Sequence, residues 1–195
     1  MSNNIKDKVN EFKKELLLEQ ASEMFEEFGY EQMKVVDLAK KAKISIGVIY
    51  SFFNSKEGLY IAYIEYHINR LYAELEKNNP PESDPKEKVH AYIELKFSYY
   101  TQKRKAIEHG AANNPLFFNT LYNEHSNPFQ KIYLYLATCF IELNPKLSQD
   151  QAMRMAFALN GFSDGYISLW LEIHDDLNER VDEVCNLFLK MLKDC

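Results

Sequence analysis

Residues 29–59, GYEQMKVVDLAKKAKISIGVIYSFFNSKEGL, decide the fold of the first part of this chain. Apolar residues recur there at intervals of three and four, which predicts short helices that share one core. The recurring positions are Val35, Leu38, Ala39 and Ala42, then Ile44, Ile49 and Phe53, then Leu59 and, just beyond the stretch, Ile61, Ala62 and Ile64. Only Lys43, Ile44 and Ser45 separate the first two segments, so their helices must cross steeply over a three-residue turn. This is helix-turn-helix geometry.

A longer amphipathic segment precedes this run and predicts one helix over 7–28 that ends at Gly29. Its apolar positions are Val9, Phe12, Leu16, Leu17, Ala21, Met24, Phe25 and Phe28. We expect this stripe to pack against the three short segments. Together they predict a small four-helix unit.

The rest of the chain also reads as helical, which makes the predicted fold class all-α. A linker over 77–85 ends at Asp84 and Pro85, which mark a helix start. Further helices are expected at 85–101, 103–109, 115–124, 128–143, 149–173 and 178–193, with start signals at Asn114-Pro115, Asn127-Pro128 and Ser148 with Gln151. We expect two domains, 1–58 and 59–195, with the helix 59–77 bridging them.

The composition indicates a folded protein with one basic surface. The 195 residues are 46 % hydrophobic and 27 % charged, which excludes a disordered chain. The net charge is −6, but residues 33–58 carry +3 while 1–32 carry −4 and 59–195 carry −5. One short segment is therefore suited to meet a polyanion while the remainder avoids it.

Other features exclude several functional classes. The first fifteen residues are charged, unlike a signal peptide, and the longest apolar stretch, 132–141, is about half the ~20 residues of a bilayer span. We expect a cytoplasmic protein without a membrane segment. The three cysteines (Cys139, Cys185, Cys195) read as reduced thiols, and the five histidines (His67, His90, His109, His125, His174) show no ligand spacing, so neither a metal nor a cofactor is expected.

The residues of the opening stretch also carry a family resemblance. They are Gly29-Tyr30, Val35–Ala39, Ala42–Ser45, Gly47–Tyr50, Phe53–Glu57 and Leu59. Residues 9–67 resemble the amino-terminal DNA-binding domain of the TetR family of transcriptional regulators. The sequence departs from the family pattern at Lys43, where the family usually has Gly. It departs again at Met33 and Lys34, where the family commonly has a Thr that caps the helix. Lys43 must either adopt a positive φ at some cost or alter the turn slightly.

The resemblance and the residue types together predict a surface that binds double-stranded DNA. The candidate residues are Lys34, Lys43, Ser45, Ile46, Gly47, Val48, Tyr50, Ser51 and Lys56. A helix that starts near Ser45 and carries Gly47 presents a slim face to the major groove. Tyr50 can donate its hydroxyl to a phosphate, and Lys56 lies near the amide-rich start of the next helix. This face has no Arg, Asn or Gln. The protein must therefore recognise the DNA sequence through contacts with thymine methyl groups, hydrogen bonds from serines and the shape of the DNA.

The helix 149–173 is apolar nearly all round, so both of its sides need partners. One side can serve its own core, and a second copy of the chain can cover the other. The resemblance implies a four-helix interface in a homodimer. The residues expected at this interface are Gly161, Gly165, Trp170 and Leu187.

The second domain is expected to bind a small molecule. The candidate ligand-binding residues are Phe97, Tyr122, Tyr133, Phe157, Asn160 and Asp164. Asn160 and Asp164 have two equal interpretations, because a polar pair on an apolar helix either faces a pocket or satisfies itself at an interface.

We therefore expect a homodimeric repressor that binds a palindromic operator and is released by an unidentified small-molecule effector. An enzyme is disfavoured, because no nucleophile–base or carboxylate pair is supported by spacing. The alternative is a helical protein-interaction module without specific DNA binding. Salt-dependent binding to duplex DNA separates the two.

Overall fold

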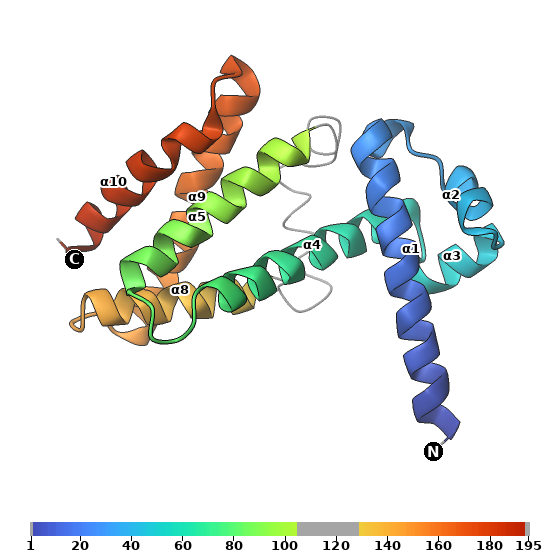
Figure 1. The fold of residues 1–195 in the computed structure, drawn as a ribbon, viewed down its shortest axis with the longest axis horizontal. Helices are drawn as coiled ribbons and strands as arrows, with labels where there is room; N and C mark the ends of the chain where they lie inside the picture. Colours follow the sequence, from blue (N-terminus) through green and yellow to red (C-terminus); the bar gives the residue numbers. More distant parts are fainter. Residues whose placement is uncertain (1, 105–128, 194–195) are drawn as a thin grey trace. The chain divides into compact units, whose positions relative to one another are not determined.

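The computed structural model describes residues 2–104 and 129–193, and every described element is a helix (Figure 1). The elements are α1 (Ser2–Gln32), α2 (Val35–Ala42), α3 (Ile46–Phe53), α4 (Lys56–Asn78), α5 (Pro85–Gln102), α8 (Gln130–Leu143), α9 (Gln149–Ile173), the 3-10 helix η2 (Leu177–Arg180) and α10 (Val181–Lys193). The predicted all-α class is confirmed. The helix predicted at 115–124, most of that at 103–109, and the start signals at 114–115 and 127–128 lie outside the described residues.

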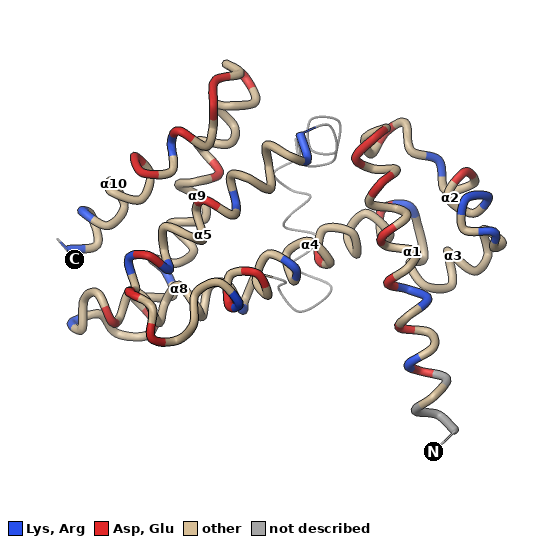
Figure 2. Tube along the Cα trace, viewed as in Figure 1, with Lys and Arg blue, Asp and Glu red and all other residues tan. Residues whose placement is uncertain are grey.

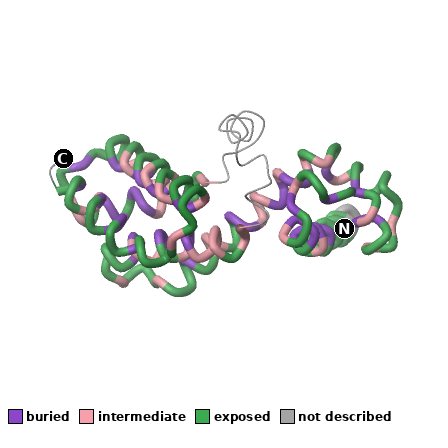
Figure 3. Tube along the Cα trace, turned by 90° about the horizontal axis from the view of Figure 1, so that it is seen from above, coloured by how far each residue is buried: buried purple, intermediate pink, exposed green. Residues whose placement is uncertain are grey.

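The described chain packs as two compact units. One contains residues 2–67 together with 103–104, and the other contains residues 68–102 and 129–193. The division lies inside α4, the helix that the sequence predicted to join the two domains. Each unit has buried residues of its own (Figure 3).

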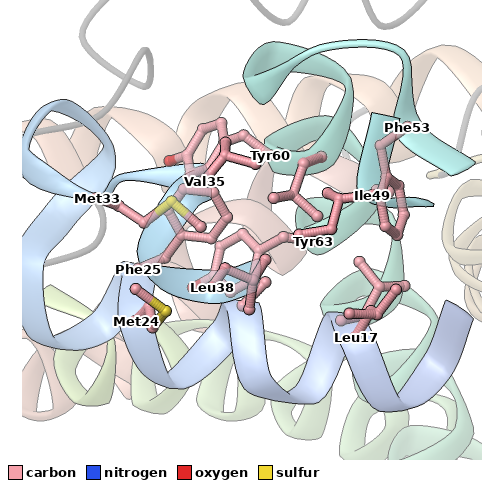
Figure 4. Close-up of a cluster of buried hydrophobic side chains, with 14 of the residues drawn as sticks. Leu17, Met24, Phe25, Met33, Val35, Leu38, Ile49, Phe53, Tyr60 and Tyr63 are labelled. Atoms are coloured by element: carbon pink, nitrogen blue, oxygen red, sulfur yellow. The ribbon is translucent and has the colours of Figure 1, made fainter. Parts of the chain in front are cut away.

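The first unit is built on α1, α2, α3 and the start of α4. Its core contains Leu17, Ala21, Phe25, Leu38, Ile49, Leu59 and Tyr60, all at most 5 % exposed (Figure 4). The backbone of α1 breaks at Gly29, where φ is 72° and ψ is 171°. Glycine tolerates this positive φ, and the helical run therefore changes direction where the sequence placed its end.

The first half of α1 contradicts part of the sequence prediction. The helix begins at Ser2, several residues earlier than expected, and Val9, Phe12 and Leu16 are 45 %, 61 % and 42 % exposed. Phe28, also predicted on the apolar stripe, is 43 % exposed. Periodicity identified the apolar face of α1, but α2 to α4 are too short to cover all of it.

The turn between α2 and α3 explains how a lysine replaces the usual glycine. Lys43 adopts the left-handed conformation, with φ 54° and ψ 41°. The Ile44 N–H donates to the Ala39 carbonyl at 3.0 Å and the Lys43 N–H donates to the Lys40 carbonyl at 3.1 Å. These two bonds form a Schellman motif, so the first of the two expected outcomes, a positive φ, is the one observed.

The second unit is a helical bundle of α5, α8, α9 and α10 around an aromatic core. Phe97, Phe140 and Phe188 are fully buried, and the rings of Phe140 and Phe188 lie 5.5 Å apart. The start of α9 is a capping box, because the Ser148 hydroxyl accepts from the Gln151 N–H and the Gln151 side chain accepts from the Ser148 N–H. This confirms the predicted helix start.

The last predicted helix, 178–193, is divided in the structure. Its first turn is η2, started by the Asp176 carboxylate, which accepts from the Asn178 N–H at 2.9 Å, and α10 follows directly. Among the helices of the described ranges, none has the long apolar run that crossing a membrane requires.

Candidate functional site

Helix α3 presents one exposed face and one buried face. Ile49 and Phe53 are 0 % and 4 % exposed and anchor the helix in the core of the first unit. The remaining positions predicted to contact DNA on this helix and at its cap are exposed, namely Ser45, Ile46, Gly47, Val48, Tyr50 and Ser51. The structure therefore places these predicted DNA-contacting residues together on one exposed surface, which we call the reading face.

The two serines on this face already make local hydrogen bonds. The Ser45 hydroxyl accepts from the Val48 N–H at 3.4 Å and thus caps α3, which leaves its own O–H free to donate outward. The Ser51 hydroxyl donates to the Val48 carbonyl at 2.7 Å, so it can only accept from a ligand. Gly47 has only the Ser45 hydroxyl oxygen near its would-be Cβ, at 3.8 Å, so the α3 surface is slim at this point.

Basic residues gather on and beside α2 (Figure 2). They differ in whether a carboxylate neutralises their charge. Lys40 pairs with Asp37 at 3.1 Å, and Lys41 pairs with Glu23 at 2.5 Å. Lys34 and Lys43 are exposed and form no ion pair with any residue that the structure describes. Lys34 precedes α2 without a side-chain cap, and Lys43 follows it. These two lysines are therefore the cations with the most freedom to meet a phosphate.

Lys56 is placed differently from the other predicted contacts. Its ammonium donates to the Glu31 carbonyl at 3.2 Å and lies 4.6 Å from the centre of the Tyr30 ring. The side chain is half-buried, and these contacts hold it against the end of α1. Ser55 caps α4, because its hydroxyl accepts from the Gly58 N–H at 2.9 Å. Lys56 thus has a structural contact in addition to its predicted role.

Gly58 is a residue that sequence reasoning missed. A Cβ at this position would lie 2.0 Å from the Phe53 carbonyl oxygen, so no other residue fits without a shift of the backbone. The close approach sets how α3 meets α4 and therefore how the reading face is held. The signal was available in the Ser55–Gly58 spacing, where a capped turn brings the two backbones together.

Comparison with known proteins agrees with this geometry. Residues 17–63 match the family described as "Bacterial regulatory proteins, tetR family", and they span α1 from Leu17 through α2 and α3 into α4. This domain belongs to the TetR family. The match covers the helix-turn-helix that the sequence predicted, including the turn at Lys43.

Relatives of this TetR domain are named as regulators. The chain is 25 % identical over 137 residues to the "HTH-type transcriptional activator FasR" of Mycolicibacterium smegmatis, which is 70 % of this chain and 59 % of that protein. It is 29 % identical over 82 residues to the "Fatty acid metabolism regulator protein" of Bacillus subtilis, 42 % of each chain. The alignments thus span less than two thirds of these relatives. None of these names describes an enzyme.

The fold extends the likeness beyond the TetR domain. The structure of the regulator FadR from Bacillus subtilis, in complex with stearoyl-CoA, superposes with a TM-score of 0.68 and 22 % identity. The superposition covers 89 % of this chain and 96 % of that one. The second unit therefore has the helical fold that accompanies the TetR domain there.

The residues predicted for a dimer interface divide into two groups. Gly161 and Gly165 have open space where a Cβ would lie, and Leu187 is 48 % exposed. Other apolar side chains are also exposed on α9 and α10, namely Phe157, Leu169, Ile173 and Met191. Trp170 corrects the prediction, because it is 5 % exposed and faces the core of its own unit. Because the sequence of α9 is apolar on nearly all sides, it did not reveal which side faces the core of its own unit.

The residues predicted to bind a ligand do not form one pocket in the described chain. Phe97 is fully buried in the core, whereas Phe157 is 60 % exposed and its ring contacts that of buried Tyr133 at 5.7 Å. Tyr122 lies outside the described residues. Asn160 and Asp164 are partly exposed and bond to each other at 3.2 Å. The polar-pair interpretation of these two residues is the one that the contacts favour.

Their main partner is Lys96, which sequence reasoning missed. This ammonium, 5 % exposed, lies 2.6 Å from Asp164 and donates to the Asn160 side chain at 2.7 Å and the Ser163 hydroxyl at 2.8 Å. Tyr92 also donates to Asn160, at 2.9 Å. Burial lowers the pKa of Lys96, and the Asp164 carboxylate opposes that shift. A lysine at an apolar position of α5 was the available signal.

Lys96 on α5 and its partners Asn160, Ser163 and Asp164 on α9 form what we call the Lys96 cluster. These contacts hold α5 and α9 together. Four acceptor atoms surround the Lys96 ammonium, which has three protons to donate, so this ammonium has no free proton for a ligand. No group of three or more metal-binding side chains occurs in residues 2–104 and 129–193.

Proposed function

We propose that this protein is a transcriptional regulator that binds a palindromic operator as a homodimer and releases it when a small molecule binds the second unit. The observation that carries the proposal is the face of α3, where six exposed positions flank a buried anchor at Ile49 and Phe53. We expect it to act in the cytoplasm as a repressor.

The DNA contacts follow from the chemistry of this face. Lys34 and Lys43 lie at the two ends of α2 and can each neutralise a phosphate, which positions the domain without reading sequence. Ile46 and Val48 are 36 % and 38 % exposed and can contact thymine methyl groups. The Ser45 O–H, free to donate outward, adds a hydrogen bond to a base or a phosphate.

A dimer is supported by the uncovered surface of α9 and α10. Phe157, Leu169 and Ile173 are 60 %, 49 % and 56 % exposed along α9, with Gly161 and Gly165 on the same helix. A patch of this kind marks an interaction surface. Because a two-fold axis pairs a surface with itself, a second copy can cover α9 and α10 with the same helices.

The decisive experiment measures binding of the full chain to a labelled duplex at several salt concentrations. We expect log K to fall linearly with log salt, and each lost phosphate contact to reduce the slope by about 0.9. Lys34→Ala should show this reduction, and Tyr50→Phe should weaken binding equally for all sequences. Lys86→Ala, an exposed lysine of the second unit, is the matched control and should change neither.

The competing function, a helical protein-interaction module, predicts a different result. Such a protein would show no salt-dependent binding to any duplex, although its exposed apolar faces would remain. A wild-type chain that fails to bind duplex DNA at low salt would therefore refute the proposed function and favour the alternative.

A further inference from the structure

A cleft of about 430 Å³ opens in the second unit between the end of α4, the start of α5 and α8. It is lined by Tyr72, Glu76, Asn79, Pro81, Lys88, Lys131, Leu134, Tyr135, Thr138, Cys139 and Glu142. The volume lies within the range of small-molecule sites. The cleft shares no residue with the predicted ligand set or with the Lys96 cluster.

The inner side of the cleft contains a buried lysine without a counter-ion. Lys88 is only 5 % exposed, and its ammonium donates to the Pro81 carbonyl at 2.5 Å. No described carboxylate lies within ion-pair distance of it. Lys96, equally buried, does have a carboxylate, that of Asp164 at 2.6 Å. Buried charges are normally paired, so Lys88 is the group in this unit that lacks what an anion would supply.

A second polar group in the cleft also lacks a partner. The Tyr135 hydroxyl is inaccessible to solvent and forms no hydrogen bond with any residue that the structure describes. Burial and the nearby Cys139, Tyr72 and Glu76 raise its pKa, so the hydroxyl keeps its proton and can donate it. An unsatisfied buried donor is unfavourable, and an acceptor on a ligand would relieve it.

The other walls set the remaining chemistry of the ligand. The Tyr72 ring packs edge-on against Tyr135 at 6.4 Å, and Leu134 is 45 % exposed beside them, so part of the cleft is apolar. Glu76 and Glu142 are exposed where they line it. Two carboxylates there repel any anion, and a polyanion most strongly, so a ligand with a single negative charge is the kind best suited to pair with Lys88.

We propose that this cleft binds an amphiphile with one carboxylate, which pairs with Lys88 and accepts from the Tyr135 hydroxyl while its apolar part lies against Tyr72 and Leu134. The ligand thus supplies the missing counter-ion and the missing acceptor together. Its role as the effector rests on the proposed function, but binding to the cleft does not.

Calorimetric titration of the full chain without DNA tests the site, with decanoate as the probe. We expect one decanoate to bind per protomer. Decylamine has the same tail with the opposite charge, and decanoyl-coenzyme A is a polyanion. Both should bind at least about tenfold more weakly.

Two variants then locate the binding. Lys88→Met keeps the length of the side chain without its charge, and it should weaken decanoate binding by about tenfold or more. Tyr135→Phe removes only the hydroxyl and should weaken binding by about three- to tenfold. Lys146→Met, an exposed lysine of the second unit that does not line the cleft, is the control and should stay within about threefold of the wild type.

Thermal unfolding without ligand gives an independent readout. Lys88→Met should unfold at a higher temperature than the wild type, because it removes an unpaired buried charge. Lys96→Met should unfold at a lower temperature, because it leaves Asp164 and Asn160 without their shared partner. No binding of decanoate by the wild type, or equal binding by the wild type, Lys88→Met and Tyr135→Phe, would overturn the proposal. Duplex binding without decanoate tests the proposed function separately.

Discussion

Replacing Lys43 by glycine should make the protein more stable and at the same time a weaker DNA binder. Lys43 has φ 54°, a conformation that costs an L-residue about 1–2 kcal/mol. Glycine avoids that cost but loses about 0.5–1 kcal/mol through its greater freedom in the unfolded chain. The net gain is about 0.5–1 kcal/mol, which corresponds to a rise in melting temperature of about 1–4 °C.

The DNA effect has a different origin, namely loss of the ammonium. If Lys43 contacts a phosphate, its removal reduces the salt slope by about 0.9 for each protomer bound. Lys43→Ala is the matched control, because it removes the same charge but keeps the Cβ that makes the positive φ unfavourable. Both variants should lose the same salt dependence, and only Lys43→Gly should gain stability.

Urea unfolding and duplex binding on the same three proteins check both parts. Equal stability of Lys43→Gly and Lys43→Ala would refute the strain argument. An unchanged salt slope in both variants would remove Lys43 from the DNA-binding surface, whatever the stability result.

Four further outcomes follow from local geometry. Gly58→Ala should lower the free energy of unfolding by about 1–3 kcal/mol in urea titrations, because its Cβ would overlap a backbone oxygen. Gly161→Leu and Gly165→Leu should leave the protomer folded but shift the mass seen in sedimentation toward monomer, because each Cβ has open space within one chain. Ser148→Ala should cost about 1 kcal/mol through loss of the capping box. Burial raises the pKa of Cys139 to about 11, so the unfolded chain loses the thiol proton first and stability should fall between about pH 9 and 11, an effect that Cys139→Ala reduces.

Local rules predicted the parts of the fold that depend on neighbours in sequence. The Ser148–Gln151 capping box and the three-residue turn at Lys43 each involve contacts within a few residues, and both occur as expected. The alternation of exposed and buried residues on α3 likewise follows from its 3.6-residue period, which placed Ile49 in the core and Tyr50 on the surface.

Features that depend on distant partners could not be predicted in the same way. Periodicity identified the apolar side of α1, yet whether Phe12 is covered depends on the length of other helices. Trp170 lies on a helix that is apolar on all sides, so only its packing against other helices shows that the ring points inward. Asp164 is paired by Lys96, which precedes it by 68 residues, and no local pattern links the two.

The two buried lysines of α5 show which sequence signal was overlooked. Lys88 and Lys96 occupy the same helix face as Val89, Tyr92 and Phe97, positions that the period assigns to the core. A lysine there requires an acceptor or an anion, since its charge cannot reach bulk water. An apolar stripe interrupted by lysine therefore predicts either a buried ion pair, as at Lys96, or a site awaiting an anion, as proposed at Lys88.

Helix α4 contributes to both units, so it limits how a ligand in the cleft can influence DNA binding. Leu59 and Tyr60, near its start, are buried in the core of the TetR domain, and Tyr72 and Glu76, near its end, line the cleft. A bound carboxylate can shift the equilibrium between two conformations of α4 only if it binds one of them more tightly. The size of the shift equals this difference in binding free energy. By linkage, operator DNA must then weaken carboxylate binding by the same factor by which the carboxylate weakens DNA binding. A cleft that binds its ligand equally well in both conformations would be a binding site without being a switch.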